Sequence, residues 1–116
     1  NVYLLMAGLA VACRHGFSLK DGVKFADQTY VNVNIHKDEN RSILNSLSVL
    51  PDSCAASADK LEEQRAIYEE GGVFSPAMID GILSQLRSFN DRTLRRDIQK
   101  KPAEVAKLVK TYFYCG

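Results

Sequence analysis

The chain has few cysteines and no cysteine motif. Its three cysteines, Cys13, Cys54 and Cys115, lie far apart and fit no C-x-x-C spacing, which excludes a zinc knuckle or a thioredoxin-type site. The two histidines, His15 and His36, have no ligand residues at metal-binding spacing, so no metal site is expected. An odd count predicts one disulfide bridge and one free or intermolecular thiol. The pairing stays open because loop-closure entropy differs little among the three choices.

Motifs for catalysis and cofactor binding are also absent. No nucleophile elbow or zincin motif frames the Ser, His and Asp residues, and the glycines are scattered instead of forming a phosphate cradle. The sequence therefore predicts a protein that is not an enzyme and that uses no cofactor. The 116 residues contain no repeat or linker, which indicates a single domain, 1–116.

The first charged side chain is Arg14, and every residue of segment 1–13 is apolar, small or uncharged. Twelve such residues make about 18 Å of helix, well short of the roughly 30 Å hydrocarbon core of a bilayer. Ala10-Val11-Ala12 is similar to a signal cleavage site, but no basic segment precedes it. A helix that is apolar on every face needs neighbours all round. We therefore expect a buried central helix here.

Apolar periodicity and capping residues predict further helices after the first, which we expect to end at His15-Gly16. Residues 30–35 alternate like a strand, but an isolated strand has no partner, so they are interpreted as a fraying helix end. The expected fold is an all-α, compact antiparallel bundle of five to seven helices around the N-terminal helix, stapled by a disulfide. Alternating helix directions would place Cys13 and Cys54 at the same end, which favours that pair. The later helices are expected over 18–33, 38–50, 53–70, 75–89, 94–100 and 102–113.

Charge is distributed unevenly although the formal net charge is only +1. Residues 1–85 hold 7 Lys/Arg against 11 Asp/Glu (−4), and residues 86–116 hold 8 against 3 (+5). A basic run in the second part is a candidate partner-binding surface, with a solvated helix face as the alternative. Nucleic acid is not expected, because the chain is weakly basic and the run lacks interleaved aromatics apart from Phe89. The run comprises Arg87, Arg92, Arg95, Arg96, Lys100 and Lys101.

Two features favour an extracellular location. The three cysteines lie where a staple could join elements, at the end of the first expected helix, the start of a middle one and the residue before the last, and disulfides are typical of secreted proteins. Asn40-Arg41-Ser42 is a glycosylation sequon in a polar stretch. The closing Tyr112-Phe113-Tyr114 is interpreted as packing, with the lining of an apolar ligand site as the alternative.

Residues 13–28 read Cys-Arg-His-Gly-Phe-Ser-Leu-Lys-Asp-Gly-Val-Lys-Phe-Ala-Asp-Gln, and the chain ends Tyr-Phe-Tyr-Cys-Gly. With the small size, helical pattern and sparse cysteines, these segments resemble the anophensin-type salivary proteins of anopheline mosquitoes. The resemblance is one of overall pattern across most of the chain and transfers no functional residue. It implies a secreted, non-enzymatic protein injected at the bite. Such proteins block the alternative complement pathway by binding its properdin-stabilised convertase, and some block contact activation.

The expected function is therefore a protein-binding inhibitor of a host plasma complex, acting through its surface without metal, membrane or nucleic acid. Three other hypotheses remain open. They are a helical carrier of a small apolar ligand, an enzyme, and a cytosolic helical adaptor with three free thiols.

Overall fold

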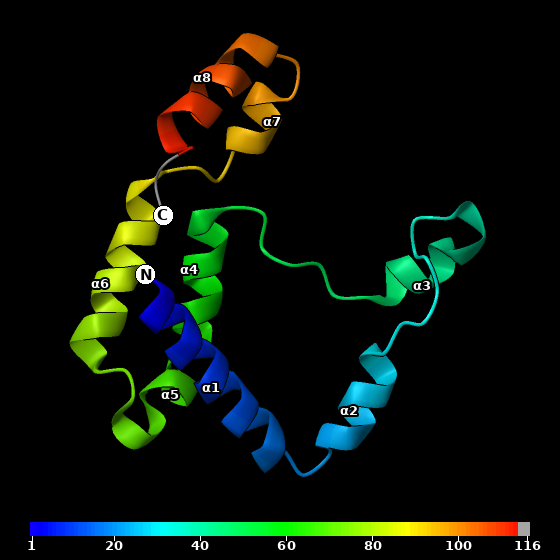
Figure 1. The fold of residues 1–116 in the computed structure, drawn as a ribbon, viewed down its shortest axis with the longest axis vertical. Coiled ribbons are helices and arrows are strands. Elements are labelled where there is room, and N and C mark those ends of the chain that lie inside the picture. The colour runs from blue at the N-terminus through cyan, green and yellow to red at the C-terminus, as the bar shows by residue number, and fades with distance from the viewer. Residues whose placement is uncertain (114–116) are drawn as a thin grey trace.

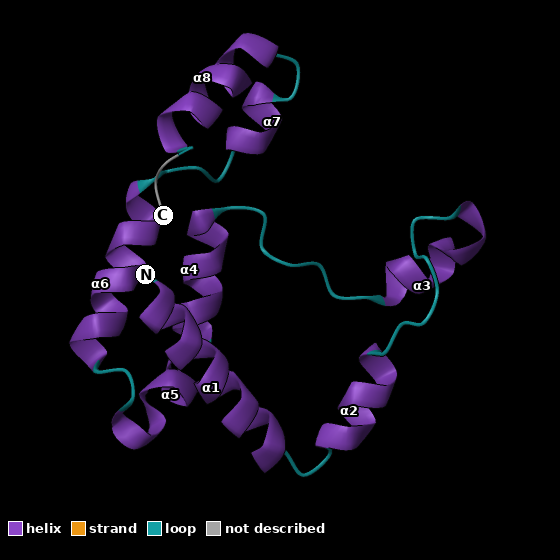
Figure 2. Ribbon diagram, viewed as in Figure 1, coloured by secondary structure: helices purple, strands orange, loops and turns teal. Residues whose placement is uncertain are grey.

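The computed structural model describes residues 1–113, and every element of regular structure within them is a helix (Figure 1, Figure 2). The predicted all-α class is confirmed. The described part contains eight α-helices instead of five to seven, because the helix expected over 53–70 is divided at Gln64. The α-helices are α1 (Val2–Ser18), α2 (Gly22–Thr29), α3 (Arg41–Ser46), α4 (Cys54–Glu63), α5 (Arg65–Glu69), α6 (Pro76–Ser88), α7 (Leu94–Ile98) and α8 (Pro102–Tyr112), with 3₁₀ turns η1 (Asp38–Asn40) and η2 (Glu70–Gly72).

Helices start where the sequence offers capping groups. The Ser53 hydroxyl accepts a 3.0 Å hydrogen bond from a backbone N–H in the first turn of α4, and Ser75 accepts one of 3.2 Å in α6. Pro76 and Pro102 occupy the first positions of α6 and α8, where a proline loses no helical hydrogen bond. These local signals predicted the three helix starts correctly.

Helix ends depart from the prediction. α1 continues past His15-Gly16 to Ser18, whose hydroxyl donates to the His15 carbonyl at 2.7 Å and so satisfies a terminal acceptor. Residues 30–37 form a loop, so the expected helix end there is wrong. α3 stops at Ser46 instead of Leu50, because the Ser46 hydroxyl donates back to the Ile43 carbonyl and Leu50 is left largely exposed.

The core lies where α1, α4 and α6 meet. α4 and α6 form the most extensive helix pair, and they lie side by side in Figure 1. Tyr68 of α5 closes the lower end of this pair with an edge-to-face contact to Phe74, at 5.9 Å between ring centroids. The buried cluster consists of Val11, Ala58, Phe74, Ile79 and Leu83.

A sharp turn joins α5 to α6 and is tied to α1. Arg14 Nη2 donates a 2.6 Å hydrogen bond to the Glu70 carbonyl. Gly71 has a φ of +75°, and a Cβ there would lie 2.6 Å from Arg14 Nη1. Both the backbone conformation and the close guanidinium therefore require glycine at position 71.

α1 is packed on one face only, so the expectation of a helix surrounded on all sides is wrong. Leu4, Ala7 and Val11 face the core. The opposite side stays exposed, and the segment that follows α1 carries α3 away from it (Figure 1). We call the bare side the outer stripe of α1; it consists of Val2, Leu5, Met6 and Leu9, each 58–63% exposed.

The described conformation is open instead of compact. Its radius of gyration is 17.5 Å, whereas a compact domain of this length has roughly 13 Å. Residues 19–53, here called the arm, carry α2, η1 and α3 away from the rest, and α7 and α8 form a separate hairpin (Figure 1). The expected compact bundle is therefore not observed, because the apolar stripes of the arm do not return to α1.

The favoured disulfide between Cys13 and Cys54 is not formed, since both are free thiols. α1 and α4 begin near the same end of the core and run in the same general direction (Figure 1). The end of α1 and the start of α4 therefore lie at opposite ends, which is the reverse of the expected alternation. Cys115 lies outside the described residues, so the rest of the predicted staple stays a prediction.

Replacing Ile79 by alanine tests the core. Ile79 is 1% exposed, and the substitution should lower the free energy of unfolding by about 2–5 kcal/mol, measured by urea denaturation. Met78 precedes it on the same helix and is 42% exposed. Met78→Ala should cost much less, and equal losses in the two variants would contradict the assignment of the core.

Candidate functional site

The six basic candidates fall into two groups in the structure. The first group, Arg87 and Arg92, forms ion pairs with acidic residues of α4. Arg87 Nη2 lies 3.4 Å from Asp59 Oδ1 and 2.5 Å from Glu62 Oε2. Arg92 Nη2 lies 2.8 Å from the other Asp59 oxygen. The hydrogen bond from Arg92 lowers the pKa of Asp59, and Arg87 adds to the effect. These two arginines thus fasten α6 and the following loop to α4.

The other four basic residues lie on α7 and the loop after it. Arg96 Nε is 3.3 Å from Asp97 of the same helix, and Lys101 Nζ is 3.6 Å from Glu104. Both pairs are exposed and local, and such surface pairs restrain a side chain weakly. Arg95 and Lys100 form no ion pair with any acidic group in residues 1–113. Their charges are therefore the ones most available to a partner.

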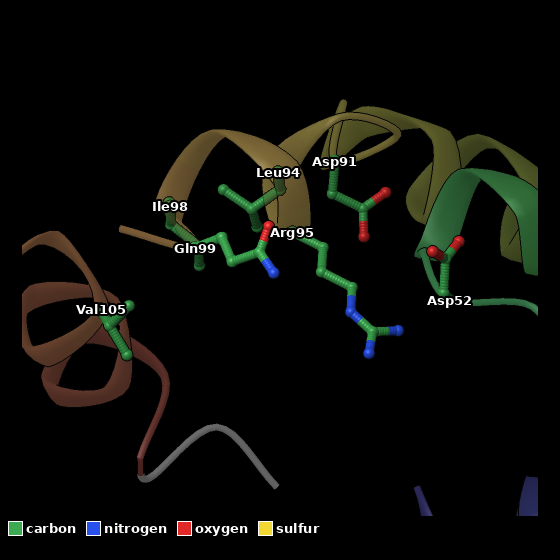
Figure 3. A pocket seen from close by; sticks show the side chains of 7 residues that line it. All are labelled: Asp52, Asp91, Leu94, Arg95, Ile98, Gln99 and Val105. Atoms are coloured by element: carbon green, nitrogen blue, oxygen red, sulfur yellow. The ribbon is translucent and has the colours of Figure 1, made fainter. Parts of the chain in front are cut away.

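Arg95 lines a shallow pocket of about 380 Å³ (Figure 3). The pocket lies between α7, α8 and two aspartates, Asp52 just before α4 and Asp91 in the loop before α7. Its side chain extends from α7 toward the side of the pocket where Asp52 and Asp91 lie (Figure 3). The guanidinium of Arg95 stands beside an apolar wall, but the carboxylates of Asp52 and Asp91 belong to the same lining, so a carboxylate inside the pocket would meet repulsion as well as attraction. The apolar wall consists of Leu94, Ile98 and Val105, and Gln99 completes the lining.

Asp91 has a structural task that the sequence did not reveal. Its two carboxylate oxygens accept hydrogen bonds from the backbone N–H groups of Cys54 (2.7 Å) and Ala55 (3.0 Å), at the start of α4. These N–H groups carry the positive end of the helix dipole. The bond from Cys54, followed by that from Ala55, lowers the pKa of Asp91. A single aspartate from a distant loop therefore caps α4 together with Ser53.

Substitution of Asp91 by alanine should destabilise the fold by about 1 kcal/mol, the usual cost of losing a helix cap, measured by urea denaturation at neutral pH. The lowered folded-state pKa makes the contribution of Asp91 complete above its unfolded pKa of about 3.9. The contribution disappears as the pH falls through the folded value. The difference between wild type and Asp91→Ala should therefore shrink on acidification, and a difference that stays constant down to about pH 2 would contradict this role.

The two described cysteines differ in chemical environment. Cys13 is exposed on α1, whereas Cys54 is partly buried beside Asp91. Burial raises the pKa of the Cys54 thiol, and the hydrogen bond and negative charge of Asp91 raise it further. Because the thiolate is the reactive form, Cys54 is poorly suited to act as a nucleophile.

Alkylation of the native protein with iodoacetamide near about pH 8 should therefore modify Cys13 before Cys54. Peptide mass spectrometry after short exposure measures the two rates. In denaturant the rates should converge, which provides the control. Faster labelling of Cys54 in the native state would show that Asp91 does not suppress its reactivity.

A second cleft of about 610 Å³ lies at the elbow between α1 and α2, whose axes are bent by 113°. Gly22 makes the elbow possible, since a Cβ there would lie 2.8 Å from the Gly16 carbonyl oxygen. Within residues 1–113 no single helix is both long and apolar enough to cross a bilayer, and α1 with α2 meets that test only as this bent pair. The cleft is lined by Ala12, Cys13, His15, Gly16, Phe17, Leu19, Gly22, Val23, Phe25 and Ala26.

The aromatic end of the chain lies elsewhere. Tyr112 packs edge-on against Phe89, at 6.2 Å between ring centroids, and so holds α8 to the end of α6. This contact agrees with the packing interpretation for Tyr112. Tyr114 lies outside the described residues.

Asn40 of the sequon is partly buried at the start of α3. Its side-chain nitrogen, the atom that would carry a glycan, donates a 2.8 Å hydrogen bond to the Asn34 carbonyl. Glycosylation of the folded chain would therefore require this turn to open.

No protein-family model matches the chain, and comparisons with curated proteins and with solved structures find no significant similarity. In the part of the chain that the structure describes, no group of three or more His, Cys, Asp or Glu residues is placed to hold a metal ion. The function is accordingly argued from the geometry above and from the resemblance of the sequence.

Proposed function

We propose that the chain is a secreted salivary protein that binds and inhibits a host defence cascade without catalysis. Its proposed target is the convertase of the alternative complement pathway. The resemblance of residues 13–28, with the all-helical pattern, supports the class of target. The open pair of charges at Arg95 and Lys100 supports binding through α7 and the loop after it.

The observation that carries this proposal is the division among the basic residues. Arg87 and Arg92 are neutralised by acidic groups of α4, whereas Arg95 and Lys100 are not paired within the described chain. Arg95 also lies beside the apolar wall of its pocket. An acidic partner segment that reaches Arg95 and Lys100 from the solvent side, away from Asp52 and Asp91, and lays an apolar side chain on the wall would match both features. A stable contact would bury roughly 800 Å² per partner. The charges would mainly set the association rate and the choice of partner.

The double variant Arg95→Glu/Lys100→Glu should inhibit alternative-pathway haemolysis at least about tenfold less potently, because two attractive contacts become repulsive. Lys37→Glu/Arg41→Glu is the matched control, since it reverses one lysine and one arginine of the arm. That control should keep its potency. Equal potency of wild type and the α7 variant would remove this surface from the proposal, and a wild-type protein without inhibitory activity would remove the target.

The elbow cleft favours a second candidate function, a carrier of a small apolar ligand. Its lining is almost entirely apolar, with His15 as the one titratable side chain besides Cys13. Native mass spectrometry of protein from its natural source should then show a bound small molecule. A ligand-free mass would leave the inhibitor as the better proposal.

A further inference from the structure

The described conformation exposes more surface than a folded monomer of its mass. Its accessible surface is 9709 Å². The usual scaling gives roughly 6,300 Å² for a monomeric protein of 12.9 kDa. The excess of about 3,400 Å² is larger than a standard protein–protein interface buries on one partner. Part of this surface is apolar, and contiguous apolar patches on a protein surface mark sites of interaction.

The outer stripe of α1 has the geometry of a helix-pairing surface. Val2, Leu5 and Leu9 follow each other at spacings of three and four, and Met6 widens the same face. The core-facing residues lie on the opposite side of the helix, so packing against α4 and α6 leaves the stripe intact. Phe17, which is 92% exposed, extends the same face beyond its far end.

The lack of charged side chains in residues 1–13 favours a second copy of the chain over a lipid surface as the partner of the stripe. No residue from 1 to 13 is charged, so two copies of this stripe meet without burying or opposing any charge. Helices that lie on membranes carry Lys and Arg along their polar face. α1 carries neither before Arg14, whose guanidinium is already bound to the Glu70 carbonyl. A second copy of the chain therefore fits the stripe better than a lipid surface does.

The available area agrees with such a contact. Four aliphatic side chains about 60% exposed, with Phe17 and the adjacent Tyr3, offer roughly 400–600 Å² on each copy. Pairing two copies would bury about 1,000 Å² in total, which reaches the lower range of specific interfaces. Exposed apolar residues of the arm lie next to α1 in the chain and can enlarge the contact.

We propose that the outer stripe of α1 is the contact surface for a second copy of this chain, and that the protein is a homodimer in which the two α1 helices pack together about a two-fold axis. The same patch on both copies makes a closed, self-complementary interface. The proposal does not depend on the proposed inhibitory function, because the stripe and the basic surface of α7 lie on different elements.

Sedimentation velocity of the purified full chain tests the proposal across about 1–100 µM. Wild type should approach twice the monomer mass of 12.9 kDa as concentration rises. Met6→Glu/Leu9→Glu should weaken association at least about 100-fold, because it places charges in an apolar contact. Val109→Glu is the matched control, since Val109 on α8 is 54% exposed and lies outside the stripe, and it should dimerise as wild type does.

Circular dichroism verifies that each variant keeps its helices. Should the glutamate variant lose them, Leu9→Ala preserves helix propensity and should still weaken the dimer about tenfold. A wild type that stays monomeric at every concentration overturns the proposal, whether or not it binds phosphatidylcholine vesicles in a parallel flotation assay. A dimer that is unchanged by folded stripe variants overturns the assignment to α1.

Discussion

The docking of α1 onto the α4–α6 pair is the interaction on which the rest of the structure depends. Val11 is 2% exposed and belongs to the same buried cluster as Ala58 of α4 and Leu83 of α6. Only six hydrophobic residues of the described chain are buried, so each one carries a large share of the apolar stabilisation. Without this contact α1 would lose its place in the core, whereas Phe74, which is 4% exposed, would still hold the turn bound by Arg14 there.

The basic residues of the run have two different roles: some form ion pairs that hold the fold together, and others keep charges that a partner can contact. Asp59 of α4 forms ion pairs with both Arg87 and Arg92. The first two residues of the basic run are therefore bound to α4. Farther along the chain the acidic partners become local or are missing, and Arg95 and Lys100 keep their charges open. Position relative to α4, more than residue type, therefore decides which basic residues are available to a partner.

Local chemistry explains which features the sequence could predict. Ser53, Ser75 and the prolines at 76 and 102 act within one helical turn, and their helix starts were predicted correctly. The absence of charged side chains in residues 1–13 indicates that each face of this part of α1 tolerates burial. It does not indicate how many other helices pack against α1, because that number depends on whether the arm folds back onto α1.

Contacts between distant residues were not predicted, because they too depend on the path of the chain and not on signals within one helical turn. No pattern in the chain connects Asp91 with Cys54 and Ala55, which lie 37 and 36 residues away. Likewise, the sequence left Arg87 of α6 consistent with a solvated helix face. Only the side-by-side packing of α4 and α6 identifies Arg87 as part of the fold.

The long-range cap has a consequence for the order in which the chain assembles. The first turn of a helix is the costly one to form, because several residues are fixed before hydrogen bonds repay them. At α4, part of that initiation is supplied by a carboxylate that arrives only after α6 has been synthesised and placed. Nucleation of α4 is thus coupled to closure of a long loop, so the two helices should acquire their order together instead of one after the other.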